Sequence, residues 1–278
     1  MSELLPLVAL LLGVGALAGL SAGLFGIGGG VVMVPALVFA FGAWGIDPGV
    51  VMHCAVATSS AVIIFNGYRS TRSHLARGSV ETALLWPQRW WSSYALWIAA
   101  GSFIGAAWLA PRLASDTLTL VFAVAAVLIA FYLMAGRSEV ALRRSVPGGA
   151  APPLVGGSVG ALSAIMGIGG GSISVPLLTL CGVPVHRAIG TAAGFGLAIA
   201  VPATLGFVLS GWGVEGRPPF SLGYVNGAGF ALIVASAWFA VPLGTALAHR
   251  LEAVPLRRIF GLCLAAVAIN MARKAGLF

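Results

Sequence analysis

The sequence has 278 residues, of which 8% are charged, and its mean hydropathy is +1.03. An average soluble domain has roughly 25% charged residues, so this composition excludes a soluble protein and indicates an integral membrane protein. The net charge of +8 does not indicate nucleic-acid binding, because the chain has no long Lys/Arg block. Arginines in cytoplasmic loops account for it instead.

The predicted membrane segments follow one another in two similar series. In the first half of the chain they cover residues 4–25, 31–42, 50–68, 91–110 and 117–136. In the second half they cover residues 154–166, a short segment that ends near residue 182, and residues 188–211, 222–247 and 256–272. The twelve residues 31–42 are too few to cross a bilayer comfortably. This order predicts an all-α polytopic membrane protein with 8–10 membrane segments.

A linker rich in Pro and Gly separates the two series. It covers residues 137–153 and contains Arg137, Arg143 and Arg144, so we expect it in the cytoplasm. The predicted organisation is therefore a first transmembrane repeat over residues 1–136, this linker, and a second transmembrane repeat over residues 154–278.

Each half contains one copy of a glycine-rich stretch. The copies are GLSAGLFGIGGGVVMVPAL at 19–37 and GALSAIMGIGGGSISVPLL at 160–178, with nine of nineteen positions identical at an offset of 141. Three consecutive glycines break a helix, so each copy predicts a broken membrane helix. Hydrophobic segments interrupted by Gly and Pro at matching positions of two halves indicate the binding site of a transporter.

The loop charges predict how the two halves are oriented. With the basic loop 69–89 in the cytoplasm, eleven of the 15 Lys and Arg residues lie inside and four outside, as the positive-inside rule requires. That loop corresponds to the weakly charged loop 212–221 of the second half, and the sparse loop 111–116 corresponds to the basic loop 248–258. Corresponding loops on opposite sides predict two inverted-topology repeats. Each broken pair either crosses the membrane or forms a re-entrant hairpin, and both alternatives fit the charges.

The glycine breaks predict a site for a small anion. A helix begins after each break, so its free N–H groups and the positive end of its dipole face the glycines, which allow an oxyanion to approach the backbone. Thr58 and Thr191 occupy matching positions of the two halves at an offset of 133. The predicted substrate-binding residues are Gly26, Gly28, Gly29, Gly30, Thr58, Ser59, Gly167, Gly169, Gly170, Gly171, Ser172 and Thr191.

Other kinds of site are weakly supported by the sequence. His53 and His186 also match between the halves, and they either carry protons or have an interfacial role near the starts of their helices. Cys54, Cys181 and Cys263 have no metal-ligand spacing. No GxSxG or HExxH motif occurs and no βαβ unit surrounds GIGGG, so we expect no enzyme, no catalytic residues, no metal and no cofactor.

The pattern GLxxGxxGIGGGxxxVP, its partner in the second half and the segment Ala55 to Ser59 resemble the TauE/SafE family of sulfite exporters over residues 10–272. The resemblance implies export of sulfite or a related sulfonate from a bacterial cell through its inner membrane, with H⁺ or Na⁺ as a possible coupling ion. It carries over to Gly26 to Gly30 with Pro35, Gly167 to Gly171 with Pro176, and Thr58, with Thr191 following in AIGTAA where the first half has AVATSS. An anion channel, or a carrier of another small organic anion, remains the alternative. Implied partners are the anionic substrate and the lipid bilayer but no nucleic acid, and an oligomer is left open.

Overall fold

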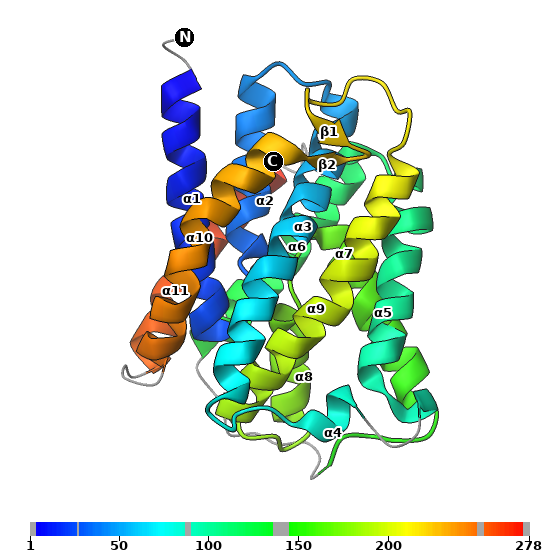
Figure 1. Ribbon diagram of the computed structural model, residues 1–278, viewed down its shortest axis with the longest axis vertical. Coiled ribbons are helices and arrows are strands. Elements are labelled where there is room, and N and C mark those ends of the chain that lie inside the picture. Colours follow the sequence, from blue (N-terminus) through cyan, green and yellow to red (C-terminus); the bar gives the residue numbers. More distant parts are fainter. Residues whose placement is uncertain (1–3, 27, 87–89, 136–144, 249–252, 275–278) are drawn as a thin grey trace.

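The chain folds into helices that run along the long axis of the molecule (Figure 1). The structure is a computed structural model, and it describes residues 4–26, 28–86, 90–135, 145–248 and 253–274. Six helical segments within these residues are long and apolar enough to cross a membrane. They are α1 (Leu4–Phe25), α3 (Pro48–Leu75), α5 (Tyr94–Ile104) with the turns η2 (Gly105–Leu109) and η3 (Ala110–Arg112), α6 (Ser115–Ala135), α9 (Val185–Ser210) and α10 (Gly227–Ala248). The prediction of an all-α polytopic membrane protein is confirmed.

The remaining elements are shorter or less uniformly apolar. They are α2 (Gly30–Ala43), α4 (Thr82–Leu85), η1 (Trp90–Ser92), η4 (Pro152–Gly156), α7 (Gly157–Met166), α8 (Gly171–Leu180) and α11 (Ala253–Lys274). Two strands of two residues each, β1 (Ser221–Leu222) and β2 (Val225–Asn226), pair antiparallel with Ser221 opposite Asn226.

Several helix ends differ from the sequence prediction. The α3 helix begins at Pro48, where Asp47 caps it by accepting a hydrogen bond from the Gly49 amide at 2.8 Å, and it continues to Leu75 instead of ending at residue 68. Hydropathy marks only the apolar part of a helix, so the polar turns at its end were assigned to the loop. For the same reason η4 begins inside the predicted linker, whose residues 137–144 lie outside the described part of the chain.

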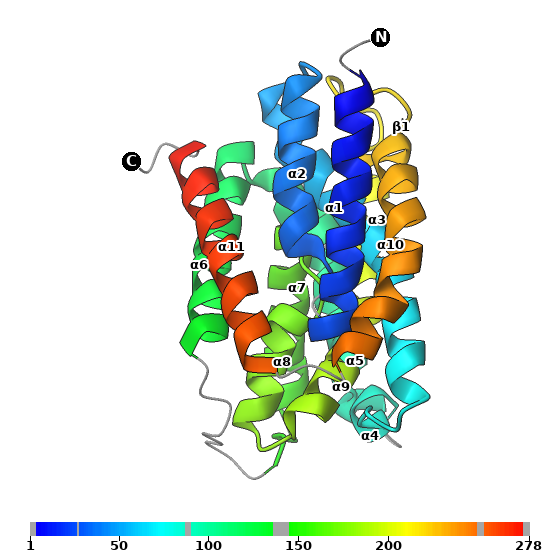
Figure 2. The ribbon, with the colours of Figure 1, turned by 90° about the vertical axis from the view of Figure 1, so that its left-hand side faces the viewer.

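The chain reverses direction at each glycine break. Figure 2 shows α2 returning beside α1 to the end of the molecule where α1 starts, while α7 and α8 occupy the opposite half. With 14 residues, α2 is about 21 Å long, and α8 with 10 residues is about 15 Å long. Both are shorter than the hydrocarbon core of about 30 Å. The α1 helix with 22 residues is long enough to cross, so the short second helices favour a re-entrant hairpin, and the choice between the two alternatives stays a prediction.

Helices from the two halves of the chain are interleaved. The α1 helix packs on α10 and α7 packs on α5, while α3 contacts α9 and α6 contacts α11. Each hairpin thus packs against a long helix of the other half, which is the packing expected of two inverted repeats. The repeat relation and its boundaries stay predictions.

Charged loops gather at the end of the molecule where α4 lies, here called the basic end (Figure 1). Arg72, Arg77 and Arg187 lie there, whereas Arg112 and Arg217 belong to loops at the other end, near β1 and β2. Further arginines predicted for the cytoplasmic side fall outside the described residues: Arg89, Arg137, Arg143, Arg144 and Arg250. Those predicted cytoplasmic loops that the structure describes therefore all lie at the basic end of the molecule.

Candidate anion site at the glycine breaks

The two glycine breaks touch each other inside the bundle. A Cβ atom placed on Gly28 would lie 3.1 Å from the Cα of Gly169, and one on Gly30 would overlap the carbonyl oxygen of Gly167. Gly26, Gly171 and the other predicted glycines of the breaks are likewise buried. Two stretches 141 residues apart in sequence are therefore in contact, as the anion hypothesis requires.

The two breaks have similar sequences but different backbones. In the first break Gly29 caps α2 with a φ of 83°, and Gly26 and Gly28 also have positive φ. In the second break Gly167 has a φ of 62°, whereas Gly170, which caps α8, has a φ of −53°. Left-handed conformations favour glycine because it lacks a Cβ, so the first break depends more strongly on glycine for its turn.

Polar side chains of α3 bind the carbonyl oxygens of both breaks. Ser59 donates its hydroxyl to the Gly167 carbonyl at 2.9 Å, and Asn66 donates its amide to the Gly28 carbonyl at 3.3 Å. All four groups are buried, and an unpaired carbonyl within the bilayer would be strongly unfavourable. Asn66 was absent from the predicted set, because a single amide in an apolar helix does not reveal its partner.

Thr58 and Thr191 make matching contacts that hold loops. The Thr58 hydroxyl accepts a hydrogen bond from the backbone N–H of Asn226 at 2.9 Å, and the Thr191 hydroxyl accepts one from the backbone N–H of Glu81 at 2.9 Å. Each threonine therefore ties the loop before a helix of the other half to a central helix. Their predicted contact with a substrate stays a prediction.

The start of α8 has an unpaired hydroxyl facing a small cavity. Ser172 is 4% exposed and has no hydrogen-bond partner within the described part of the chain. It lines a cavity of about 20 Å³ together with Gly171 and, from α6, Tyr132. A space of this size holds about one water molecule. Ser163 and Ser174, on either side of the same break, are also buried without a partner in the described residues. This concentration of unpaired hydroxyls at the second break was not predicted.

The two histidines differ in their surroundings. His53 is 4% exposed, its Nε2 lies 3.1 Å from the Ala110 carbonyl, and its ring stacks on Tyr224 at 5.2 Å. Burial raises the pKa of Tyr224, so this phenol stays neutral near pH 7. His186 is exposed at the start of α9. In the described ranges, no group of three or more His, Cys, Asp or Glu residues is placed to hold a metal ion.

Helices long enough to span, two opposed helical hairpins and a buried polar centre define a multi-pass α-helical membrane protein. The chain belongs to the sulfite exporter TauE/SafE family, whose pattern it matches over residues 11–271. It is therefore a membrane transporter, and the resemblance inferred from the glycine motifs is confirmed.

Relatives from several organisms match along most of their length. The chain is 34% identical over 273 residues to a "Probable membrane transporter protein" of Haemophilus influenzae, covering 96% of this chain and 98% of that protein. A protein of the same name from Xylella fastidiosa is 29% identical, with 93% and 92% covered. "Probable membrane transporter protein MJ0441" of Methanocaldococcus jannaschii is 26% identical, with 87% and 84% covered. These names state no substrate, and no solved structure gives a significant match.

Proposed function

We propose that this transporter exports a small oxyanion, sulfite or a related sulfonate, across a bacterial inner membrane, and that the anion binds where the two glycine breaks meet. The observation that carries the proposal is the contact between the breaks, with an unpaired serine hydroxyl at the start of α8. The substrate class comes from the family, whose description is that of sulfite exporters.

The start of α8 has the chemistry that an oxyanion requires. The first amide groups of a helix lack carbonyl partners within the helix and lie at the positive end of its dipole. Ser172 adds a hydroxyl donor to these amides, and a hydrogen bond to a charged group is stronger than one between neutral groups. The anion is thus bound without a buried Arg or Lys.

Transport requires this site to widen. A cavity of about 20 Å³ has room for one water molecule, which is less than an oxyanion with three oxygens needs. The α1–α2 and α7–α8 hairpins start from opposite ends of the molecule. Movement of either hairpin away from the other would therefore open the site toward one side of the membrane, which is the alternating-access mechanism. The coupling ion is H⁺ or Na⁺.

Sulfite flux into proteoliposomes tests this function. We expect saturable uptake that responds to a pH or Na⁺ gradient and is inhibited by sulfoacetate more strongly than by sulfate. Ser172→Ala should raise the KM for sulfite roughly tenfold, because it removes a hydrogen bond to a charged group that contributes on the order of 1.5 kcal/mol. Thr204→Val is the control, since the Thr204 hydroxyl is bonded to a carbonyl of its own helix, that of Ala200, at 2.7 Å.

The same vesicles separate a carrier from a channel. Unlabelled sulfite on the far side should accelerate uptake of labelled sulfite by a carrier, because both directions share one alternating site, whereas a channel shows no such acceleration. Absence of sulfite flux with folded protein would remove sulfite as the substrate. An unchanged KM in Ser172→Ala would contradict the proposed anion site at the start of α8.

A further inference from the structure

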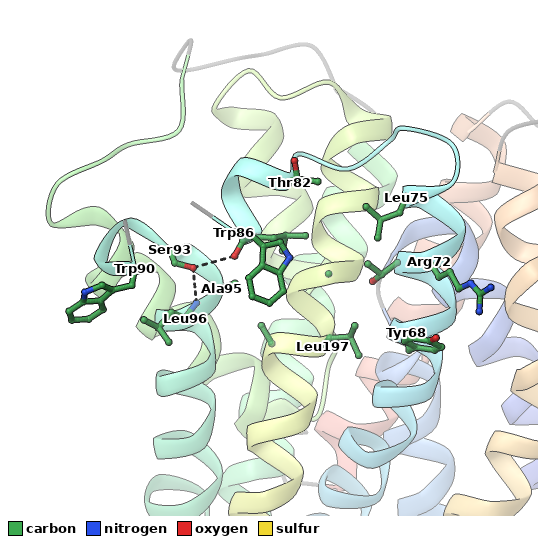
Figure 3. Close-up of a pocket in the computed structure, with 14 residues that line it drawn as sticks. Tyr68, Arg72, Leu75, Thr82, Trp86, Trp90, Ser93, Ala95, Leu96 and Leu197 are labelled. Carbon is green, nitrogen blue, oxygen red and sulfur yellow. Dashed lines mark hydrogen bonds between the residues drawn. The ribbon is translucent and has the colours of Figure 1, made fainter. Parts of the chain in front are cut away.

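A large cavity lies near the basic end, away from the glycine breaks. Its volume is about 920 Å³, within the range typical of small-molecule sites. Figure 3 shows it between α3, α9 and α5, with α4 and the start of α5 closing one end. The side chains that line it are mainly apolar and include Leu75, Leu85, Trp86, Leu96 and Leu197.

The α9 helix separates this cavity from the anion site. Gly194 lines the cavity, and a Cβ on it would lie 2.8 Å from the Cδ1 of Leu85. A Cβ on Gly196 would instead lie 3.7 Å from the Gly170 amide nitrogen in the second break. Residues two apart on a helix point in nearly opposite directions. The cavity is therefore on the outer side of α9, and its apolar walls suit hydrocarbon and not a small oxyanion.

Arginines lie directly beside the cavity. Tyr68 and Arg72 of α3 line both the cavity and an adjoining groove of about 450 Å³, and the groove also contains Arg69 and Arg77. In Figure 3 the Arg72 guanidinium points away from Trp86, across α3 toward the side of this groove. Arg72 is exposed and forms no salt bridge with any described residue. The positive charge beside the apolar cavity is thus available to an anionic group.

Among the residues that the structure describes, no neighbouring side chain neutralises this charge. Glu81, in the segment that leads into α4, is paired with Arg187 at 2.6 Å. Trp86 and Trp90 are 84% and 64% exposed at the edge of the cavity. Exposed tryptophans beside arginines are typical of the boundary between lipid headgroups and acyl chains. An apolar cavity with cations at its rim, at the basic end of the bundle, matches a phospholipid that has an anionic headgroup.

We propose that this cavity binds one anionic phospholipid from the leaflet at the basic end. An acyl chain lies against Leu85, Leu96 and Leu197, and the phosphate is bound by Arg72 at the rim that the cavity shares with the groove. Such a lipid fills the space between α3, α9 and α5, and its binding does not depend on which anion the protein transports.

Native mass spectrometry of the purified protein in detergent tests the proposal. With phosphatidylglycerol and phosphatidylcholine of identical chains added in turn, we expect one phosphatidylglycerol to bind at least about fivefold more tightly. Arg72→Gln should remove that preference, since one basic residue at an anionic lipid surface contributes about a fivefold change in affinity. Arg112→Gln is the matched control, because Arg112 is an exposed arginine at the opposite end, where it stacks on Trp108.

A second variant tests the cavity itself. Ala198 lines the cavity, so Ala198→Phe should displace the acyl chain and reduce phosphatidylglycerol binding at least tenfold. Ala235→Phe adds the same ring at an exposed position of α10 and should leave binding unchanged. Only variants that elute as monodisperse protein are compared. Quenching of tryptophan fluorescence by a brominated acyl chain provides a second measurement of lipid binding on these variants. Equal binding of the two lipids, or wild-type binding by Arg72→Gln or by Ala198→Phe, would overturn the proposal.

Discussion

Ser59 and Ser60 are neighbours on α3 with different partners. Ser59 donates its hydroxyl to the Gly167 carbonyl in the second break, whereas Ser60 donates to the Val56 carbonyl of its own helix at 2.9 Å. Both side chains are buried. Any serine in a helix can bond to the preceding turn, so sequence alone could not establish which of the two crosses to the other half.

This difference predicts unequal effects of two matched substitutions. Ser59→Ala leaves the buried Gly167 carbonyl without the serine hydroxyl and should destabilise the protein by about 1–3 kcal/mol. Ser60→Ala should have an effect of about 0.5 kcal/mol or less, because the Val56 carbonyl still accepts its helical hydrogen bond. Thermal unfolding in one detergent measures both variants. An equal loss of stability in the two would contradict the assigned role of Ser59.

At the scale of the element, small residues determine where helices meet. Gly15, Gly19 and Gly23 lie one turn apart on α1 and face α10, where a Cβ on Gly19 would be 2.8 Å from the Ala237 carbonyl oxygen. Gly13 on the same helix has nothing within 4 Å of its Cβ position. Small residues allow close helix packing in membranes. The spacing of this row is typical of close helix packing, but it does not identify the partner, which is a helix more than 200 residues away.

Alanine substitutions at two glycines of α1 should therefore change the stability of the protein differently. Gly19→Ala should destabilise the protein by about 1–3 kcal/mol, because the added methyl group forces α1 and α10 apart. Gly13→Ala should be neutral or stabilise it by up to about 1 kcal/mol, since alanine favours a helix more than glycine does. Size-exclusion chromatography after heating ranks the variants. If Gly19→Ala is as stable as Gly13→Ala, the close contact between α1 and α10 is wrong.

Both hairpins follow from the lengths of their elements and from the glycines between them. The boundaries of α1 and the start of α2 were predictable because three consecutive glycines interrupt the apolar run. The end of α3 was not, since its last turns are polar and their environment depends on α4, α9 and the cavity between them. The sequence also leaves open whether each broken pair re-enters or crosses the membrane, because both arrangements have the same loop charges.

At the scale of the whole molecule, the end of the bundle at which a residue lies predicts which side of the membrane that residue faces. Ala43 and Ala114 are exposed at the end opposite the basic end, and Ala76 is exposed at the basic end. In a variant without Cys54, Cys181 and Cys263, Ala43→Cys and Ala114→Cys should react with an impermeant maleimide on intact cells. Ala76→Cys should react only after permeabilisation, because the positive-inside rule predicts that the basic end lies in the cytoplasm.

Two outcomes of this labelling would be informative. Reaction of Ala76→Cys in intact cells would reverse the orientation inferred from the arginines. Protection of Ala43→Cys, with Ala114→Cys labelled, would contradict the return of α2 to the outer end. Labelling of each variant after detergent solubilisation is the control for accessibility of its thiol.

The sequence by itself determined the class of the protein and the positions of its two glycine breaks. Composition, hydropathy and a repeated motif are properties of the chain that do not depend on its folding. Only the tertiary structure decided that Gly30 touches Gly167, that Ser59 and Asn66 bind the two breaks, and that Thr58 and Thr191 hold loops. These are contacts between helices far apart in sequence, and helix packing sets them through shape and hydrogen-bond satisfaction, which no local pattern encodes.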